Sequence, residues 1–315
     1  MSRFVSPDLS RLPAPDALEA LDFEALVTAR LATLVERAQA RGFPYDVETL
    51  ESDPLVIDQQ TGAVHELTVR SRVNDAVRAV LLVTATGPQL DHIAATYYGI
   101  SRLVVTPATG NQPAVMEADA DFRARIALAV EAWSTAGPEG AYIFHALEAD
   151  GNVLDVAVYS EEDGAVYANA TPVLAPEVLV VVLSRLGNGT PSNALLAKVL
   201  DDLSGREVRP IGDKVVVEPA TIVPYAVTAT LRVRAGADPA LLAAEARSRV
   251  EAYVTARRRV GAIVQKLGLG AALKVTDVEE IVLTSPATDV DPGSKGAGFC
   301  TAITITTEAA EDSWR

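Results

Sequence analysis

The feature that most constrains this chain is a change of hydrophobic period at Gly137-Pro138. Before this point, apolar residues recur every three or four positions, which is typical of amphipathic helices. After it, short segments alternate apolar and polar residues or run as uninterrupted apolar stretches bounded by turns, which is typical of strands. We therefore expect an α+β protein, with a helical N-terminal region followed by two small α+β sandwich domains.

The first half of the chain contains a series of predicted helices. The first follows Asp22, a good N-cap residue, and keeps one apolar face from Phe23 to Ala38. The second begins after Pro54, and we expect it to end at Gly87-Pro88, because glycine is a common C-cap and proline cannot continue a helix. Two more apolar faces are predicted, one of Leu90, Ile93, Ala94 and Tyr97 ending at Gly99, the other of Phe122, Ile126, Val130 and Trp133 with Asp119 as cap.

The second half contains predicted strands and helices in an order that is partly repeated. A helix over 139–149 precedes strands at 153–160, 176–185 and 213–220, and a helix capped by Ser192 precedes the last of these. This order predicts helices on one face of a mainly antiparallel sheet. A strand at 222–235, a helix capped by Asp238 and strands at 274–286 and 298–308 follow. Residues 160–176 are long for a hairpin and predict a solvent-facing excursion.

The domain boundaries follow from these changes of pattern. We expect a helical region over 1–102, a connector and helix over 103–136, a first α+β domain over 137–220 and a second over 221–315.

Composition excludes several classes of protein. The chain has 27 Lys and Arg against 42 Asp and Glu, a formal charge of −15, which argues against broad contact with nucleic acid. No uninterrupted apolar run is long enough to span a membrane, and the first thirty residues lack the pattern of a secretory signal. The lone Cys300 fits a reducing compartment such as a bacterial cytoplasm. The one basic cluster, Arg257-Arg258-Arg259, ends a predicted helix, where cations complement the helix dipole.

The three histidines do not predict a catalytic or metal site. His65-Glu66 begins like a zinc-protease helix motif, but the position four residues after His65 is Val69 instead of a second histidine. Asp91-His92 are helix neighbours whose side chains point about 100° apart, and Asp91 is better placed to bind free backbone N–H groups in the first turn. His145 lies in an apolar helix and is interpreted as a packed or surface residue.

The glycine-rich segments are equally weak as ligand motifs. The segment with Gly268 and Gly270 lacks the third glycine and the acidic partner of a dinucleotide site. The 185–193 segment lacks the lysine of a phosphate loop, and it predicts a turn that leads into the Ser192 cap. No spacing of carboxylates singles out a glycosidase pair. We therefore expect no catalytic, cofactor or metal site.

Arginine is the remaining signal. Arg70, Arg72 and Arg78, with Asn74, surround a predicted helix whose other face is strongly apolar. A plain solvated face is one interpretation. The other is a helix that meets carboxylates of neighbouring helices, in this chain or another, through bidentate pairing.

Taken together, several segments resemble the baseplate J-like family, the wedge subunits of contractile phage tails and related injection or bacteriocin-type particles. The matching segments are "LPAPDALEALDFEAL", "TLESDPLV", "RSRVNDAVRAVLLVTATGPQLDHIAATYYGISRL", "PAVMEADADFRARI", "STAGPEGAYIFHAL", "REVRPIGDKVVVEPATIVPYAVTATL", "EAYVTARRRVG" and "GFCT". They run in order from residue 12 to residue 301 and so cover nearly the whole chain. The 160–176 excursion fits the family pattern least well.

The resemblance implies a structural component instead of an enzyme, located in the tail baseplate of a virion or tail-like particle and assembled in the host cytoplasm. It implies that the helical region bundles with a second wedge protein, and that the α+β domains dimerise with other copies of the chain to help close a ring around the central hub. Sheath-initiating and hub proteins are further implied partners; nucleic acid and membrane are not. The candidate interface residues are Arg70, Arg72, Asn74, Arg78, Arg102, Tyr253 and Arg259.

Two further expectations concern motion and the alternative function. A wedge ring rearranges when a tail contracts, so hinges are expected, and the proline and glycine content favours Leu103–Glu117 and Gly137-Pro138. The alternative is a cytoplasmic enzyme or small-molecule binding protein with an unrecognised site.

Overall fold

The computed structural model describes residues 15, 17–45, 50–134, 136–163, 173, 176–234 and 236–309. The chain divides into two compact units, one within Pro7–Ser101 and the other beginning at Arg102. The first is helical and the second contains helices and small sheets, so the expected α+β class is confirmed. The four domain boundaries stay a prediction.

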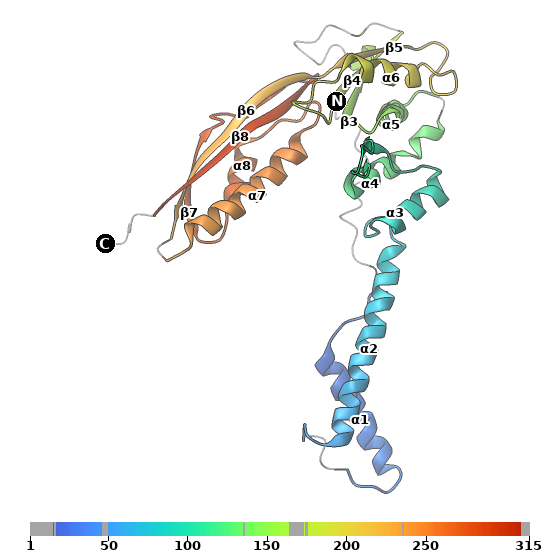
Figure 1. Cartoon of the computed structure of the whole chain (residues 1–315), viewed down its shortest axis with the longest axis vertical. Helices are drawn as coiled ribbons and strands as arrows, with labels where there is room; N and C mark the ends of the chain where they lie inside the picture. The colour runs from blue at the N-terminus through green and yellow to red at the C-terminus, as the bar shows by residue number, and fades with distance from the viewer. Residues whose placement is uncertain are drawn as a thin grey trace. The chain divides into compact units, whose positions relative to one another are not determined.

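The helical unit is built on a hairpin of two helices (Figure 1). Its elements are α1 (Phe23–Gln39), α2 (Pro54–Ala79), α3 (Pro88–Ile93) and the π-helix η2 (Ala94–Tyr98). Asp22 caps α1 as expected, since its Oδ1 accepts a hydrogen bond from Ala25 N at 3.0 Å. Leu26 and Val27 of α1 pack against Ala63 of α2, and this is a small core for helices of such length.

Helix α2 ends eight residues earlier than the glycine-proline signal predicts. The Thr84 hydroxyl donates to the Arg78 carbonyl at 2.7 Å and thereby occupies an acceptor of the last helical turn. The β-branched residues Val80, Val83 and Thr84 also have low helix propensity. Gly87 instead holds the N-cap position of α3, with a φ of +52° that favours glycine.

Tyr97 is exposed, contrary to the prediction that it shares an inward face with Leu90 and Ile93. The cause is the π-helix after Ile93, whose wider turn changes the phase of the following side chains. Leu90, Ile93 and Ala94 are buried as expected, and Gly99 ends the segment in a left-handed conformation.

The second unit opens with a short hairpin and a helix. Strands β1 (Val104–Thr106) and β2 (Val115–Met116) pair antiparallel, followed by α4 (Asp119–Leu128) and the 3-10 turn η3 (Glu131–Trp133). Asp119 is the first residue of α4, and Ala118 takes the N-cap position. Phe122 and Ile126 are buried, but Val130 and Trp133 are exposed, because α4 ends at Leu128 and the 3-10 turn changes the helical phase. The four-residue face predicted there is therefore wrong in its second half.

The first sheet has the order β3-β4-β5. Its elements are α5 (Glu139–Ala149), β3 (Val153–Tyr159), the 3-10 turn η4 (Glu161–Asp163), β4 (Glu177–Ser184), α6 (Asn193–Leu203) and β5 (Lys214–Pro219). Ser192 caps α6, with Oγ accepting from Leu195 N at 3.2 Å. The sheet is mixed instead of mainly antiparallel: β3 and β4 are antiparallel, but α6 is a crossover that brings β5 parallel to β4.

The second sheet has the order β7-β6-β8. Its elements are β6 (Thr221–Val233), α7 (Pro239–Arg257), α8 (Lys266–Leu273), β7 (Val278–Ser285) and β8 (Gly296–Ala309), and α7 and α8 lie along one face (Figure 1). Alternate β6 residues, among them Val227 and Leu231, pack against Leu242 and Ala246 of α7. Helix α8 was not predicted from the sequence, and its Leu269 and Leu273 complete this core.

The two sheets are joined by a shared apolar core. Val260, after α7, and Ala297, in β8 of the second sheet, pack against Leu179, Val181 and Leu183 of β4. Because β4 is covered on both faces, its sequence is a continuous apolar run. Most of the predicted 160–176 excursion lies outside the described residues, but Val173 is buried in this core.

Candidate interaction surfaces

The C-terminal half of α2 carries an apolar face that no described helix covers. Helix α2 has 26 residues against 17 in α1, so its end extends beyond its partner. Val69, Val73 and Val80 are 61%, 42% and 72% exposed, and they lie with exposed Ala76 at spacings that place all four on one side of the helix. We call these four residues the α2 stripe. A row of exposed valines is the composition expected for a helix that packs against another helix.

The opposite side of α2 is used within the chain. Asn74 is buried, and its amide accepts from Glu19 N at 2.8 Å and donates to Glu19 O at 2.9 Å. Arg70 pairs with Glu66 at 2.7 Å and with Glu19 at 3.2 Å. These two predicted interface residues therefore hold the segment before α1 against α2.

Arg72 and Arg78 remain on the surface of α2, where Arg72 flanks the α2 stripe and Arg78 lies on the opposite side of the helix. Arg72 is exposed and has no ion pair or hydrogen bond with any described residue. Arg78 lies 3.5 Å from Asp75, a weak contact between two exposed side chains. Of the four residues predicted on this helix, these two are available to carboxylates of another chain.

Arg102 belongs to a buried charge cluster that the sequence did not reveal. Its guanidinium donates to Glu117 O at 2.7 Å, pairs with Asp119 at 2.8 Å and lies over the Phe122 ring. Arg125, only 2% exposed, binds both carboxylate oxygens of Glu117, at 3.2 and 2.7 Å, and also pairs with Glu148 of α5. The only sequence signal was a charged residue, Arg125, next to the buried Ile126 on an otherwise apolar helix face.

This cluster also closes the segment predicted as a hinge. Glu117 N donates to Leu103 O at 2.8 Å, and Leu103 N donates to the Glu117 carboxylate at 3.3 Å. The second predicted hinge, Gly137, lies against Pro210, where an added Cβ would come within 2.8 Å of the proline ring. Both hinges stay predictions.

Tyr253 and Arg259 lie at the end of α7. The Tyr253 hydroxyl bonds to both the backbone N and O of Gln265, at 3.2 and 3.3 Å, so it fixes the start of α8. Arg257 lies over the Tyr253 ring, and Arg259 is exposed just beyond the helix. Gly268 is required here, since an added Cβ would approach the Tyr253 hydroxyl at 2.2 Å.

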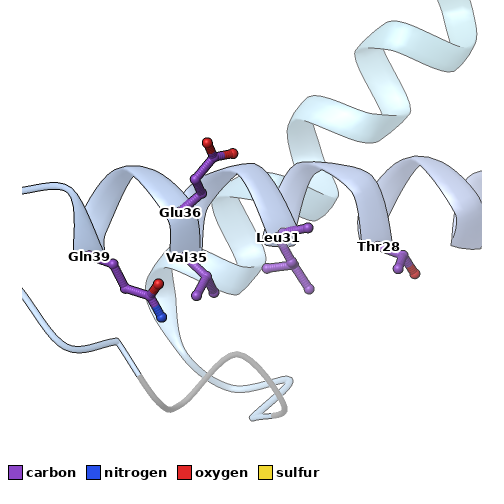
Figure 2. A pocket seen from close by; sticks show the side chains of 6 residues that line it. Thr28, Leu31, Val35, Glu36 and Gln39 are labelled. Atoms are coloured by element: carbon purple, nitrogen blue, oxygen red, sulfur yellow. The ribbon is translucent and has the colours of Figure 1, made fainter.

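Helix α1 has an open hollow along its side (Figure 2). Thr28, Leu31, Val35 and Gln39 point to the same side of the helix, and Ala32 and Glu36 complete the lining. The floor is aliphatic, so its chemistry suits an apolar side chain of a neighbouring protein better than a polar small molecule.

The residues considered for chemistry belong to two different compact units. Asp91 and His92 are consecutive in α3, and His145 is on α5. Burial lowers the pKa of His145, although its backbone bond with Ala132 and the charge of Asp202 oppose this. Within the described ranges, no three His, Cys, Asp or Glu side chains gather to hold a metal, and no helix is long and apolar enough to cross a membrane.

Comparison with known proteins identifies the family. The model of the baseplate J-like N-terminal domain matches residues 51–109, which include α2 and α3, and that of the baseplate J-like central domain matches residues 134–219, which include the first sheet. Baseplate protein J of Escherichia phage P2 is 40% identical over 316 residues, covering 97% of this chain and 99% of that protein. The chain belongs to the baseplate J-like family. The resemblance read from the sequence segments is thereby confirmed.

A solved structure is also similar to this baseplate J-like chain. It is a chain of the six-fold symmetrised cryo-EM structure of the anti-feeding prophage baseplate, with 15% sequence identity and a TM-score of 0.37. The match covers 64% of this chain and 43% of the other.

Proposed function

We propose that this chain is a structural wedge subunit of the baseplate of a contractile phage tail or tail-like particle, without catalytic activity. The observation that carries the proposal is its 40% identity, over nearly the full length of both chains, to a phage baseplate protein. Its location would then be the tail baseplate of the particle, after assembly in the host cytoplasm. It links wedges into a ring around the central hub and rearranges on contraction.

The partners follow from the surfaces of the two units. The helical unit bundles with a second wedge protein, and the uncovered α2 stripe, with Arg72 beside it and Arg78 exposed on the same helix, supports this role. The α+β unit contacts other copies of the chain, and sheath-initiating and hub proteins complete the assembly. Hinges at Leu103–Glu117 and Gly137-Pro138 remain part of this proposal. If the domains on either side of these segments meet at the same angle in extended and contracted particles, the two hinges are contradicted.

The proposal is tested by replacing residues of the α2 stripe and the two exposed arginines of α2. V69S/V73S and R72E/R78E change exposed side chains, so the isolated chain keeps its circular dichroism spectrum and melting temperature. Both variants are expected to impair co-purification with the wedge partner and to reduce the number of complete particles seen by electron microscopy. The control is L241S, which removes an exposed leucine from α7.

Three outcomes separate the alternatives. Normal assembly of both variants refutes the role of the exposed C-terminal half of α2. Absence of the chain from purified particles refutes the structural role itself. A monomeric chain that binds or turns over a metabolite supports the alternative of a cytoplasmic enzyme or binding protein.

A further inference from the structure

Three consecutive arginines at the end of α7 form no ion pair with any described residue. Arg257 is the last residue of the helix, Arg258 is its C-cap, and Arg259 follows. Arg257 and Arg258 lie over the rings of Tyr253 and Phe299, and Arg258 donates to the Gly187 carbonyl at 2.9 Å. The helix dipole stabilises cations at this end, but its effect is confined to the last turn and is equivalent to about half a charge. Three positive charges exceed what the dipole offsets.

Arg258 is the most buried of the three. Its Nε is buried and has no hydrogen-bond partner within the described chain. Burial and the nearby positive charge of Arg185 lower the pKa of Arg258. The nearby carboxylate of Asp121 is already paired with Arg185 at 2.6 Å, so it does not serve as the partner of Arg258. A carboxylate beside the solvent-facing part of such a half-buried guanidinium would stabilise its charge.

An acidic cluster lies at the far end of β3, the strand that borders the second sheet. We call the contact between β3 and the residues around Val260 and Ser294 the seam. Arg258 is bonded to Gly187, two residues after Arg185, and Arg185 N donates to Asn152 O just before β3. The arginines therefore lie near the start of β3, and the cluster Glu161-Glu162-Asp163 follows its end. Contacts fix the seam between these points: Val260 N donates to Asp155 at 2.7 Å, and the Tyr159 hydroxyl donates to Ser294 O. The two charge clusters are thus held at opposite ends of one strand.

The acidic cluster has carboxylates to spare. Asp163 accepts from Ser160 N and Oγ at 3.0 and 3.1 Å, which fixes the turn. Glu161 and Glu162 are exposed and form no ion pair with the residues that the structure describes. They therefore remain available to cations of another molecule.

Two clusters of opposite charge at the two ends of one strand are complementary to those of a second copy after a two-fold rotation when both clusters lie on one face. We propose that Arg257, Arg258 and Arg259 of one copy bind Glu161 and Glu162 of a second copy, and that the reciprocal contact forms across a two-fold axis beside the Asp155–Val260 hydrogen bond. This inference rests on the proposed function, in which copies contact one another. Because the chain carries a formal charge of −15, copies repel at long range, and these local pairs select one orientation.

The test is a charge exchange in the full-length chain, measured by sedimentation equilibrium at physiological salt. R257E/R259E makes both ends acidic and E161R/E162R makes both ends basic, so each variant alone is expected to self-associate at least about tenfold more weakly than the wild type. A one-to-one mixture of the two variants restores association, since both contacts are complementary again. The control R247E/R249E makes the same change of net charge on the same helix and leaves association near the wild-type value. Circular dichroism verifies that each variant is folded.

The results that overturn the inference are specific. They are a wild-type chain that stays monomeric, reversal variants that associate normally, a mixture that fails to restore association, or a control that weakens it equally. Binding of duplex DNA that depends on Arg257 and Arg259, without self-association, also overturns it. If the chain self-associates as expected but is absent from particles, only the proposed function is refuted. If the chain is found in particles but the reversal variants self-associate normally, only this inference is refuted.

Discussion

Individual charged residues in this protein differ sharply in what their ion pairs contribute. Arg249 pairs with Glu245 on the surface of α7, where water screens the charges and each side chain loses entropy on pairing. Arg125 is buried with Glu117, and removal of either partner leaves a charge without water or a counter-ion. The same residue type is therefore nearly neutral for stability in one place and essential in the other.

Arg125→Met is expected to lower the free energy of unfolding by about 3–5 kcal/mol, because it leaves the Glu117 carboxylate buried and unpaired. Urea denaturation measures this value. Arg249→Ala is the control and is expected to cost less than about 1 kcal/mol. The double variant R125M/E117L recovers a large part of the loss, since the buried charge is gone. Equal costs for Arg125→Met and Arg249→Ala contradict this account.

His145 makes stability depend on pH. Burial lowers the pKa of His145 below its usual value, so the unfolded chain takes up the proton more readily than the folded chain. The contribution of neutral His145 to the free energy of unfolding is therefore present above about pH 6.5, the usual pKa of histidine, and is lost as the pH falls below that value. Melting temperatures at about pH 7.5 and 5.5 are expected to differ less in His145→Gln than in the wild type. An unchanged difference rules out His145 as the cause.

At the scale of elements, two glycines show how packing partners decide the effect of one methyl group. A Cβ at Gly62 in α2 would lie 2.0 Å from Arg30 Nη2, the mobile end of a long side chain. A Cβ at Gly151, before β3, would lie 2.4 Å from Val104 O, a backbone atom of β1. A side chain can turn away from the added methyl group, whereas a strand must be displaced.

Gly62→Ala is expected to raise the free energy of unfolding by up to about 1 kcal/mol, because alanine favours the helix and Arg30 moves aside. Gly151→Ala is expected to lower it by about 1–3 kcal/mol, since the β1–β2 hairpin must separate from β3. Urea denaturation of the two variants supplies the comparison. A stabilising Gly151→Ala, or a strongly destabilising Gly62→Ala, would show that these contacts are misassigned.

For the whole molecule, the two compact units differ in how much apolar surface they bury. Between α1 and α2, the buried core is Leu26, Val27 and Ala63. The second sheet packs a much larger set of buried residues against α7 and α8. Helices derive most of their stability from packing, so the helical hairpin is expected to be the less stable unit in the free chain.

Hydrogen exchange of the free full-length chain tests this difference. Amides of α1 are expected to exchange at least about tenfold faster than those of β6, and the wedge partner is expected to slow exchange in α2. Equal protection of α1 and β6 in the free chain contradicts the expectation. Unchanged exchange of α2 in the complex argues against the α2 stripe as the contact.

The sequence by itself determined the features that depend on neighbouring residues. The caps at Asp22, Ser192 and Asp238 were predicted because a capping side chain bonds to a backbone N–H two or three positions away. The α+β class followed from the period of apolar residues, and the family from ordered segments along the chain.

Only the tertiary structure decided contacts between distant residues. Asn74 meets Glu19 across 55 positions, and Arg125 meets Glu148 across 23, and no local pattern specifies either pair. Exposure of Tyr97 and Trp133 resulted from a π-turn and a 3-10 turn, which shift a helical phase without a clear sequence signal. The physical reason is that caps and periods are set by local backbone geometry, whereas pairing partners are chosen when the whole chain packs.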